Sequence, residues 1–122
     1  MTSREDLLAA VRAFLREDLQ PQLSGRAAYQ NRIAANVLAM LERQETMGPR
    51  IEALDKAFAE ARGLDGADMP AAVARALRDG VLEEDGELRR YLRQRALIRT
   101  RMDAPRYGAL GEALGRWGDE EQ

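Results

Sequence analysis

Five polar side chains stand inside stretches of sequence that otherwise repeat apolar residues at the spacing of an α-helix. They are one carboxylate, one amide and three guanidinium groups: Asp18, Arg32, Asn36, Arg95 and Arg99. An unpaired charge within an apolar stripe costs several kcal/mol, so each of these groups needs a partner or water. We therefore predict that Asp18, Arg32 and Asn36 converge inside the fold with at least one of Arg95 and Arg99.

Three interpretations of this polar cluster are open. In the first, which we expect, the groups form a closed internal network in which Asp18 pairs with Arg95 or Arg99. In the second, Arg32, Arg95 and Arg99 line a pocket for an anion, because arginine suits bidentate recognition of carboxylate or phosphate. In the third, the cluster belongs to an interface with a partner protein, where arginine and tyrosine are favoured anchors.

The residue types that carry much of enzymatic chemistry are missing from the sequence. Its 122 residues include no cysteine and no histidine, which excludes a disulfide framework, a zinc site of Cys and His ligands, a cysteine nucleophile and every histidine-based triad. Neither a glycine-rich phosphate loop nor a nucleophile elbow occurs. We therefore predict no catalytic residue, no metal site and no cofactor, and do not expect an enzyme.

Composition also narrows the setting and the partners. The formal net charge is −2 and aromatic residues make up 5% of the chain, which argues against binding to nucleic acid or to an anionic membrane surface. No segment approaches the roughly 20 apolar residues of a membrane span, and the charged N-terminus is unlike a signal peptide. A cytoplasmic location is the expectation that follows.

Helical periodicity runs through almost the whole chain, and no stretch alternates β-branched and polar residues as a half-buried strand would. We predict an all-α, single-domain bundle of about five helices plus a short C-terminal helix, with the second helix central. The expected helical ranges are 2–20, 26–46, 49–62, 68–80, 87–103 and, for the short helix, 107–117. Residues 1–117 form the domain, and residues 118–122 are expected to be a frayed tail.

Helix boundaries are indicated by capping and breaking residues. Thr2 and Glu5 have the spacing of a capping box at the start of the first helix, and Asp68 is a typical N-cap for the fourth. Glycine commonly ends a helix and proline commonly occupies a first turn. Gly48 and Pro49 are therefore expected to separate the second helix from the third.

Two segments of the chain resemble a family of small helical bacterial proteins of unknown function. The longer, residues 14–49, carries Gly25-Arg26, Ala34-Ala35-Asn36 and Gly48-Pro49, and the shorter, RMDAPRY at residues 101–107, resembles the closing motif of the same family. Genes for members of that family often lie beside kinases similar to aminoglycoside phosphotransferases and beside acyl-CoA dehydrogenases. The resemblance implies an accessory role near such enzymes and transfers no catalytic residue to this chain.

Two classes of function follow from these observations. The first is a non-catalytic accessory or interaction protein, which docks to a neighbouring phosphotransferase-like kinase, to an acyl-CoA dehydrogenase or to itself. The alternative is a small-molecule binding protein whose inward arginines hold a phosphate, nucleotide or acyl-CoA-like anion. The second predicted helix has apolar residues on more than one side, and leftover apolar surface of this kind is what homodimers bury, so we also expect a homodimer.

Overall fold

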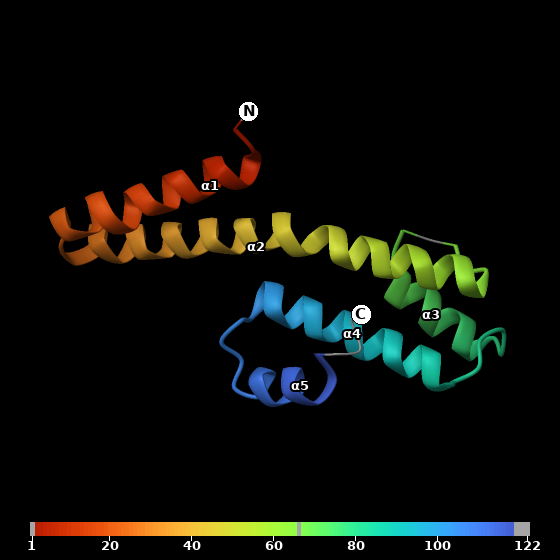
Figure 1. Cartoon of the computed structure of the whole chain (residues 1–122). Coiled ribbons are helices and arrows are strands. Elements are labelled where there is room, and N and C mark those ends of the chain that lie inside the picture. The colour runs from red at the N-terminus through yellow and green to blue at the C-terminus, as the bar shows by residue number, and fades with distance from the viewer. Residues whose placement is uncertain (1, 66, 119–122) are drawn as a thin grey trace. The chain divides into compact units, whose positions relative to one another are not determined.

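The computed structural model of the chain describes residues 2–65 and 67–118, and within these residues it contains helices and connecting turns without a strand. The all-α prediction is confirmed. Figure 1 shows the α-helices in chain order: α1 (Arg4–Ala13), α2 (Gly25–Arg62), α3 (Met69–Arg78), α4 (Gly86–Asp103) and α5 (Leu110–Trp117). A π-helical segment, η1 (Phe14–Leu19), and a 3₁₀ turn, η2 (Gln20–Gln22), extend α1 toward α2.

The second helix is longer than the sequence pattern indicates. The prediction that Gly48 and Pro49 separate two helices is wrong, because α2 runs unbroken from Gly25 to Arg62. Proline lacks the backbone N–H that a helix interior uses, and its ring clashes with the backbone and Cβ of the residue before it. Here that residue is Gly48, which has no Cβ, so this part of the clash before Pro49 is absent.

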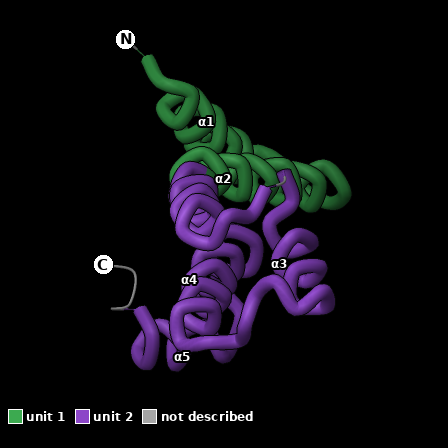
Figure 2. Tube along the Cα trace, turned by 90° about the vertical axis from the view of Figure 1, so that its right-hand side faces the viewer, with its two compact units in different colours: residues 1–48 green, residues 49–122 purple. Residues whose placement is uncertain are grey.

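The described chain forms two compact units, which meet in the sequence between Gly48 and Pro49. Figure 2 colours them green and purple, and α2 contributes residues to both. We refer to residues 1–48 as the hairpin unit and to residues 49–122 as the second unit. That residues 1–117 form a single domain stays a prediction.

In the hairpin unit, α1 lies antiparallel to the first part of α2 (Figure 1). Ion pairs join the two helices: Arg4 at the start of α1 contacts Glu45 at 3.1 Å, and Arg12 in its last turn pairs with Glu42. The side chains that α2 buries in this unit include small ones, such as Ala35, which is 2% exposed. Small side chains let two helix backbones approach closely. The hairpin is therefore held by ion pairs and a thin alanine contact.

A buried amide fixes the turn of the hairpin. Asn31 on α2 donates from Nδ2 to the carbonyl oxygen of Leu15 at 2.8 Å and to Gln20 Oε1 at 2.7 Å. Leu15 lies within the π-helical segment, where the ordinary i to i+4 ladder is interrupted and carbonyl groups need other donors. Asn31 supplies such a donor and so ties η1 to α2.

The start of α1 lies one residue later than predicted, whereas α3 starts as expected. Ser3 and Asp6 form the capping box of α1, so the prediction that Thr2 and Glu5 form it is wrong. Both pairs have the same i, i+3 spacing, and spacing alone does not choose between them. Asp68 caps α3 as predicted, with its side chain accepting a hydrogen bond from the backbone of the first turn.

The second unit has a core of its own. Apolar side chains from α2, α3, α4 and their connections pack together there: Phe58, Met69, Val73, Ala76, Leu82, Leu88 and Tyr91. The rings of Phe58 and Tyr91 are stacked with their centroids 4.2 Å apart. At the edge of this core Arg62 contacts Asp85 at 2.9 Å and Glu87 at 2.8 Å, which attaches the end of α2 to the start of α4.

At the C-terminus, Gln94 Nε2 on α4 donates to the carbonyl oxygen of Trp117 at 3.0 Å and holds α5 against α4. Gly118 caps α5, with its N–H bonded to Leu114. The rest of the predicted frayed tail, residues 119–122, lies outside the described residues.

The continuity of α2 leads to a first prediction. Pro49→Ala should stabilise the protein by up to about 3 kcal/mol, because proline in a helix interior lacks the N–H of the helical ladder and its ring clashes with the preceding turn. The matched control is Gly25→Ala, where φ is +59°; the left-handed conformation should make that change destabilising by about 1–2 kcal/mol. Urea unfolding followed by circular dichroism measures both. A loss of stability in Pro49→Ala would contradict an unbroken helix at this point.

Candidate functional site

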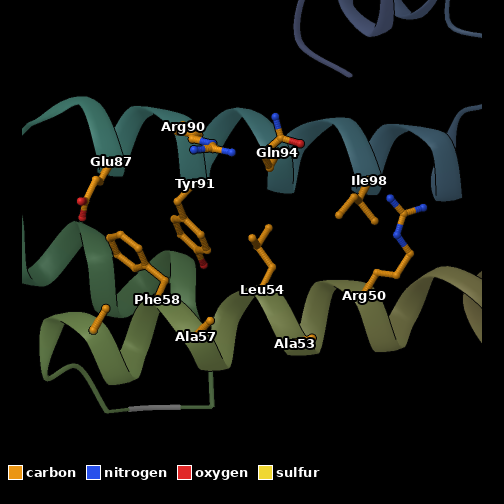
Figure 3. A pocket seen from close by; sticks show the side chains of 11 residues that line it. Arg50, Ala53, Leu54, Ala57, Phe58, Glu87, Arg90, Tyr91, Gln94 and Ile98 are labelled. Atoms are coloured by element: carbon orange, nitrogen blue, oxygen red, sulfur yellow. The ribbon is translucent and has the colours of Figure 1, made fainter. Parts of the chain in front are cut away.

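The second unit contains a pocket of about 590 Å³ between the end of α2 and α4. Figure 3 shows Leu54 and Phe58 on α2 facing Tyr91 and Ile98 on α4 across it, whereas the Gln94 side chain points away from α2. Its walls are mainly aliphatic and aromatic, with a few polar groups at their edges: Arg50, Ala53, Leu54, Ala57, Phe58, Ala61, Glu87, Arg90, Tyr91, Gln94 and Ile98. The volume is in the range of pockets that take small organic molecules, roughly 300–1,000 Å³.

The charged residues of the pocket lie on both helices that form it. Arg50 reaches from α2 toward Ile98, whereas Arg90 and Glu87 belong to α4 (Figure 3). Two guanidinium groups against one carboxylate give the pocket a net positive lining at neutral pH. A ligand with an apolar body and an anionic group would match this combination of walls and charges.

Beside the pocket, three polar side chains form a compact hydrogen-bonded group, the Asp55 triad, made up of Asp55, Tyr91 and Arg95. The Tyr91 hydroxyl donates to Asp55 Oδ1 at 2.6 Å. Arg95 donates from Nε to Oδ1 at 2.9 Å and from a terminal nitrogen to Oδ2 at 3.3 Å. The Asp55 carboxylate therefore receives a bidentate arginine and a phenol at the same time.

The surroundings of the Asp55 triad shift the pKa values of two of its members. Burial raises the pKa of the Tyr91 hydroxyl above its ordinary value, and the hydrogen bond to Asp55 raises it further. The hydrogen bond to Asp55 likewise raises the pKa of Arg95. At neutral pH Tyr91 is thus a neutral donor and Arg95 a cation, and both satisfy the same carboxylate. The triad stabilises the packing of α4 against α2, and none of its members activates another for a reaction.

Two of the five residues singled out by the sequence pattern lie on α4 and have partners in the second unit. Arg95 pairs with Asp55, whose side chain is 19% exposed. Arg99 pairs with Asp103 one turn further along the same helix at 2.9 Å, and both of these side chains are largely in solvent. Of the two arginines on α4 that were predicted to point inward, Arg95 is therefore half-buried, whereas Arg99 lies at the surface.

The other three, Asp18, Arg32 and Asn36, belong to the hairpin unit, and all three are exposed. Asn36 accepts a hydrogen bond from Arg16 at 3.2 Å. The expectation that they are buried fails for a physical reason: the apolar stripe of α2 used to place Arg32 and Asn36 is itself exposed. The predicted convergence of these three residues with at least one of Arg95 and Arg99 joins groups from both units and stays a prediction.

Asp55 is the residue that the sequence pattern should have indicated. It lies one turn after Ile51 and three residues before Phe58, both of which are buried. At helical spacing this places a carboxylate on the core face of α2, the same kind of misfit that singled out Arg95. A search for opposite charges on apolar stripes would have paired Asp55 with Arg95.

A second feature with functional potential is an uncovered apolar surface on the hairpin unit. We call it the open face of α2. It consists of large hydrophobic side chains that are between 39% and 59% exposed: Tyr29, Ile33, Val37, Met40 and Leu41. On α1 and η1, Leu7, Val11 and Phe14 are likewise at least half exposed. Soluble monomers seldom leave so much apolar surface in water, and such patches commonly bind other proteins.

The described residues also bear on membrane crossing and on metal binding. Across residues 2–65 and 67–118, no helix combines the length and the apolar character that crossing a lipid bilayer requires. In the same residues, no group of three or more carboxylates is arranged to hold a metal ion.

Comparison with known proteins identifies the family. The chain matches the model of a domain of unknown function, DUF6285, over residues 21–107. Because this match covers well over half of the chain, the protein belongs to that family. The match ends at Tyr107, the last residue of the RMDAPRY motif. Neither curated proteins nor solved structures provide a match to the chain.

The Asp55 triad yields a second prediction. Asp55→Ala should destabilise the protein by about 1–3 kcal/mol, because it leaves a half-buried guanidinium and a buried phenol without their acceptor. The matched control is Arg99→Met, which removes an exposed i, i+4 ion pair and should cost less than about 0.5 kcal/mol. Urea unfolding at pH 7 compares the two. Equal effects in both variants would show that the Asp55 triad does not brace the second unit.

A third prediction concerns alkaline pH. The pKa of Tyr91 is higher in the folded protein than in an unfolded chain, where it is about 10. The stabilisation linked to its proton is therefore complete below about pH 10 and is lost as the pH rises further. Tyr91→Phe should flatten the decline of unfolding free energy above pH 10, measured by urea titration at successive pH values. Tyr29 and Tyr107 remain in both proteins as a common background, and parallel declines would contradict the assignment.

Proposed function

We propose that this protein is a non-catalytic interaction protein that works by docking through the hairpin unit. The observation that carries the proposal is the open face of α2, with the neighbouring apolar side chains of α1. Eight large hydrophobic residues between Leu7 and Leu41 are exposed, out of twelve in the described residues. Their exposure disfavours an isolated chain in water, and covering them with a protein surface removes that cost.

The polar groups of the second unit support the same proposal. Asp55, Tyr91 and Arg95 lie beside the pocket and are hydrogen-bonded to one another. Groups arranged in this way stabilise packing, whereas a catalytic acid or base needs an open hydrogen-bonding position toward a substrate. An accessory role requires no reactive group.

Candidate partners come from the family resemblance and from the apolar surface. The resemblance suggests a kinase similar to aminoglycoside phosphotransferases or an acyl-CoA dehydrogenase, encoded nearby in a bacterial genome, and a cytoplasmic setting suits both. The apolar surface suggests a partner that offers helices of its own, which includes a second copy of this chain.

The experiment is a sedimentation-velocity analysis of the chain alone and mixed with each candidate enzyme. We expect an assembly larger than one chain in at least one mixture or in the protein alone. Ile33→Glu, on the open face, should weaken that assembly at least tenfold, whereas Val81→Glu, at an exposed valine outside the hairpin unit, should leave it unchanged. If Ile33→Glu changed no association, the proposal would fail.

A second candidate function is binding of an amphipathic anion, which the pocket between α2 and α4 favours. The pocket joins apolar walls to Arg50 and Arg90, a chemistry that fits a medium-chain carboxylate or the acyl end of an acyl-CoA. In this version Arg50 and Arg90 replace the Arg32, Arg95 and Arg99 of the sequence-based hypothesis.

Thermal denaturation with decanoate, octanoyl-CoA, ATP and inorganic phosphate tests this candidate. A saturable stabilisation by decanoate or octanoyl-CoA is expected, of about 2.7 kcal/mol at a hundredfold excess over Kd. Ala57→Phe should fill the pocket and abolish this stabilisation, while Val81→Glu should leave the stabilisation unchanged. Stabilisation by phosphate or ATP alone, or none at all, would exclude an amphipathic ligand here.

A further inference from the structure

We propose that the open face of α2 is covered by a second copy of this chain, packed antiparallel across a two-fold axis that passes beside Val37. This inference rests on the proposed function, because it names the partner of the same docking surface. It is carried by three features of α2: its two apolar sides, the symmetry of its exposed side, and the absence of charge on that side.

The first part of α2 has contact faces on two opposite sides. At 3.6 residues per turn, the buried residues Ala28, Asn31 and Ala35 lie between about 120° and 180° around the helix from Val37. They face α1 and η1, as the hydrogen bond from Asn31 to Leu15 shows. The hairpin therefore covers one side of α2, and the side centred on Val37 points away from that contact. A helix that is apolar on opposite sides requires a second layer.

The exposed side has a nearly palindromic sequence about Val37. Positions 3 and 4 residues away on either side are apolar, and positions 7 residues away are glutamine on both sides. All of these side chains are exposed, and they lie within about 60° of Val37 at helical spacing: Gln30, Ile33, Ala34, Val37, Met40, Leu41 and Gln44.

A palindromic face is complementary to itself when two copies run antiparallel. In a two-fold interface the contact of residue i with residue j is repeated as j with i. Ile33 then meets Leu41 of the second copy, and Gln30 meets Gln44, so that apolar groups pack together and the amides pair at both ends. An unrelated partner would place no such requirement on the sequence, and this symmetry selects a second copy over other occupants.

Charge and area agree with this arrangement. The charged residues between Gln30 and Gln44 are Arg32, Glu42 and Arg43, and helical spacing places all three more than about 100° from Val37, outside the contact. Taking side chains of this size at about 200 Å² each, the five hydrophobic residues of the open face expose on the order of 500 Å². The open face thus supplies more than half of the roughly 800 Å² per partner that standard interfaces bury.

Light scattering coupled to gel filtration tests the assembly. Across the micromolar range we expect twice the 13.6 kDa mass of one chain. Val37→Glu brings two carboxylates together at the axis and should give a mass of one chain, with less helix by circular dichroism. Val81→Glu is the matched control and should keep the doubled mass. A wild-type mass of one chain would overturn the inference.

Disulfide trapping tests the register and does not depend on whether Val37→Glu folds. The chain has no cysteine, so each introduced one is alone. Val37→Cys should cross-link to itself on mild oxidation, and Gln30→Cys should cross-link with Gln44→Cys in a mixture far more than either does with itself. Val81→Cys is the control and should stay uncross-linked. A dimer that trapped none of these pairs would exclude the antiparallel face.

The outcomes separate this inference from the proposed function. If the wild-type chain is monomeric but Ile33→Glu still weakens binding to another protein, the second copy is wrong and the docking surface stands. If the chain is monomeric and Ile33→Glu changes nothing, both fail, and the open face is covered within one chain.

Discussion

A pair of antiparallel helices can cover only one side of each helix, and the first part of α2 is apolar on two. Ala28 and Ala35 are buried on one side of α2, whereas Val37 and its neighbours on the other side face solvent. Hydrophobic burial is the main favourable term in folding, and a two-helix hairpin has little of it. The stability of the hairpin unit is therefore tied to whatever covers the open face of α2.

The second unit is built differently, because its polar residues lie at the edge of a core of their own. Three helices and their turns enclose Leu88, which is 1% exposed, together with the stacked rings of Phe58 and Tyr91. Asp55 and Arg95 pair at the edge of this core. The second unit buries a core of its own, pairs Asp55 with Tyr91 and Arg95, and leaves open a pocket of ligand size. The hairpin unit buries small side chains and leaves its large apolar side chains between Leu7 and Leu41 exposed.

The continuous helix connects these two unequal parts of the sequence. Because α2 passes through Gly48 and Pro49 without a break, its residues belong to both units. An interaction that covers the open face would stabilise a helix whose other end carries Asp55 and one wall of the pocket. Docking and ligand binding, if both occur, would thus share one structural element.

Periodicity predicted the helical class and most of the elements, because apolar spacing and capping residues are local signals. It missed the union at Gly48–Pro49, because glycine commonly ends a helix and proline commonly occupies the first turn of the next, whereas here the missing Cβ of Gly48 permits a helical conformation before Pro49. It also assigned Arg32 and Asn36 to a core face, because a stripe of apolar residues looks the same whether the chain itself or a partner covers it. Asp55 was not predicted as a site residue, although its spacing from Phe58 places it on the core face of α2.

Hydrogen exchange of the backbone amides of residues 29–44 tests the central claim most directly, because it reports whether this helix is stable by itself. If a second protein surface is required, protection of these amides should fall as the purified protein is diluted a hundredfold, while amides near Leu88 and Tyr91 in the second unit keep theirs. Protection of residues 29–44 that is strong and independent of concentration would contradict the account, because it would show that one chain alone covers the open face of α2.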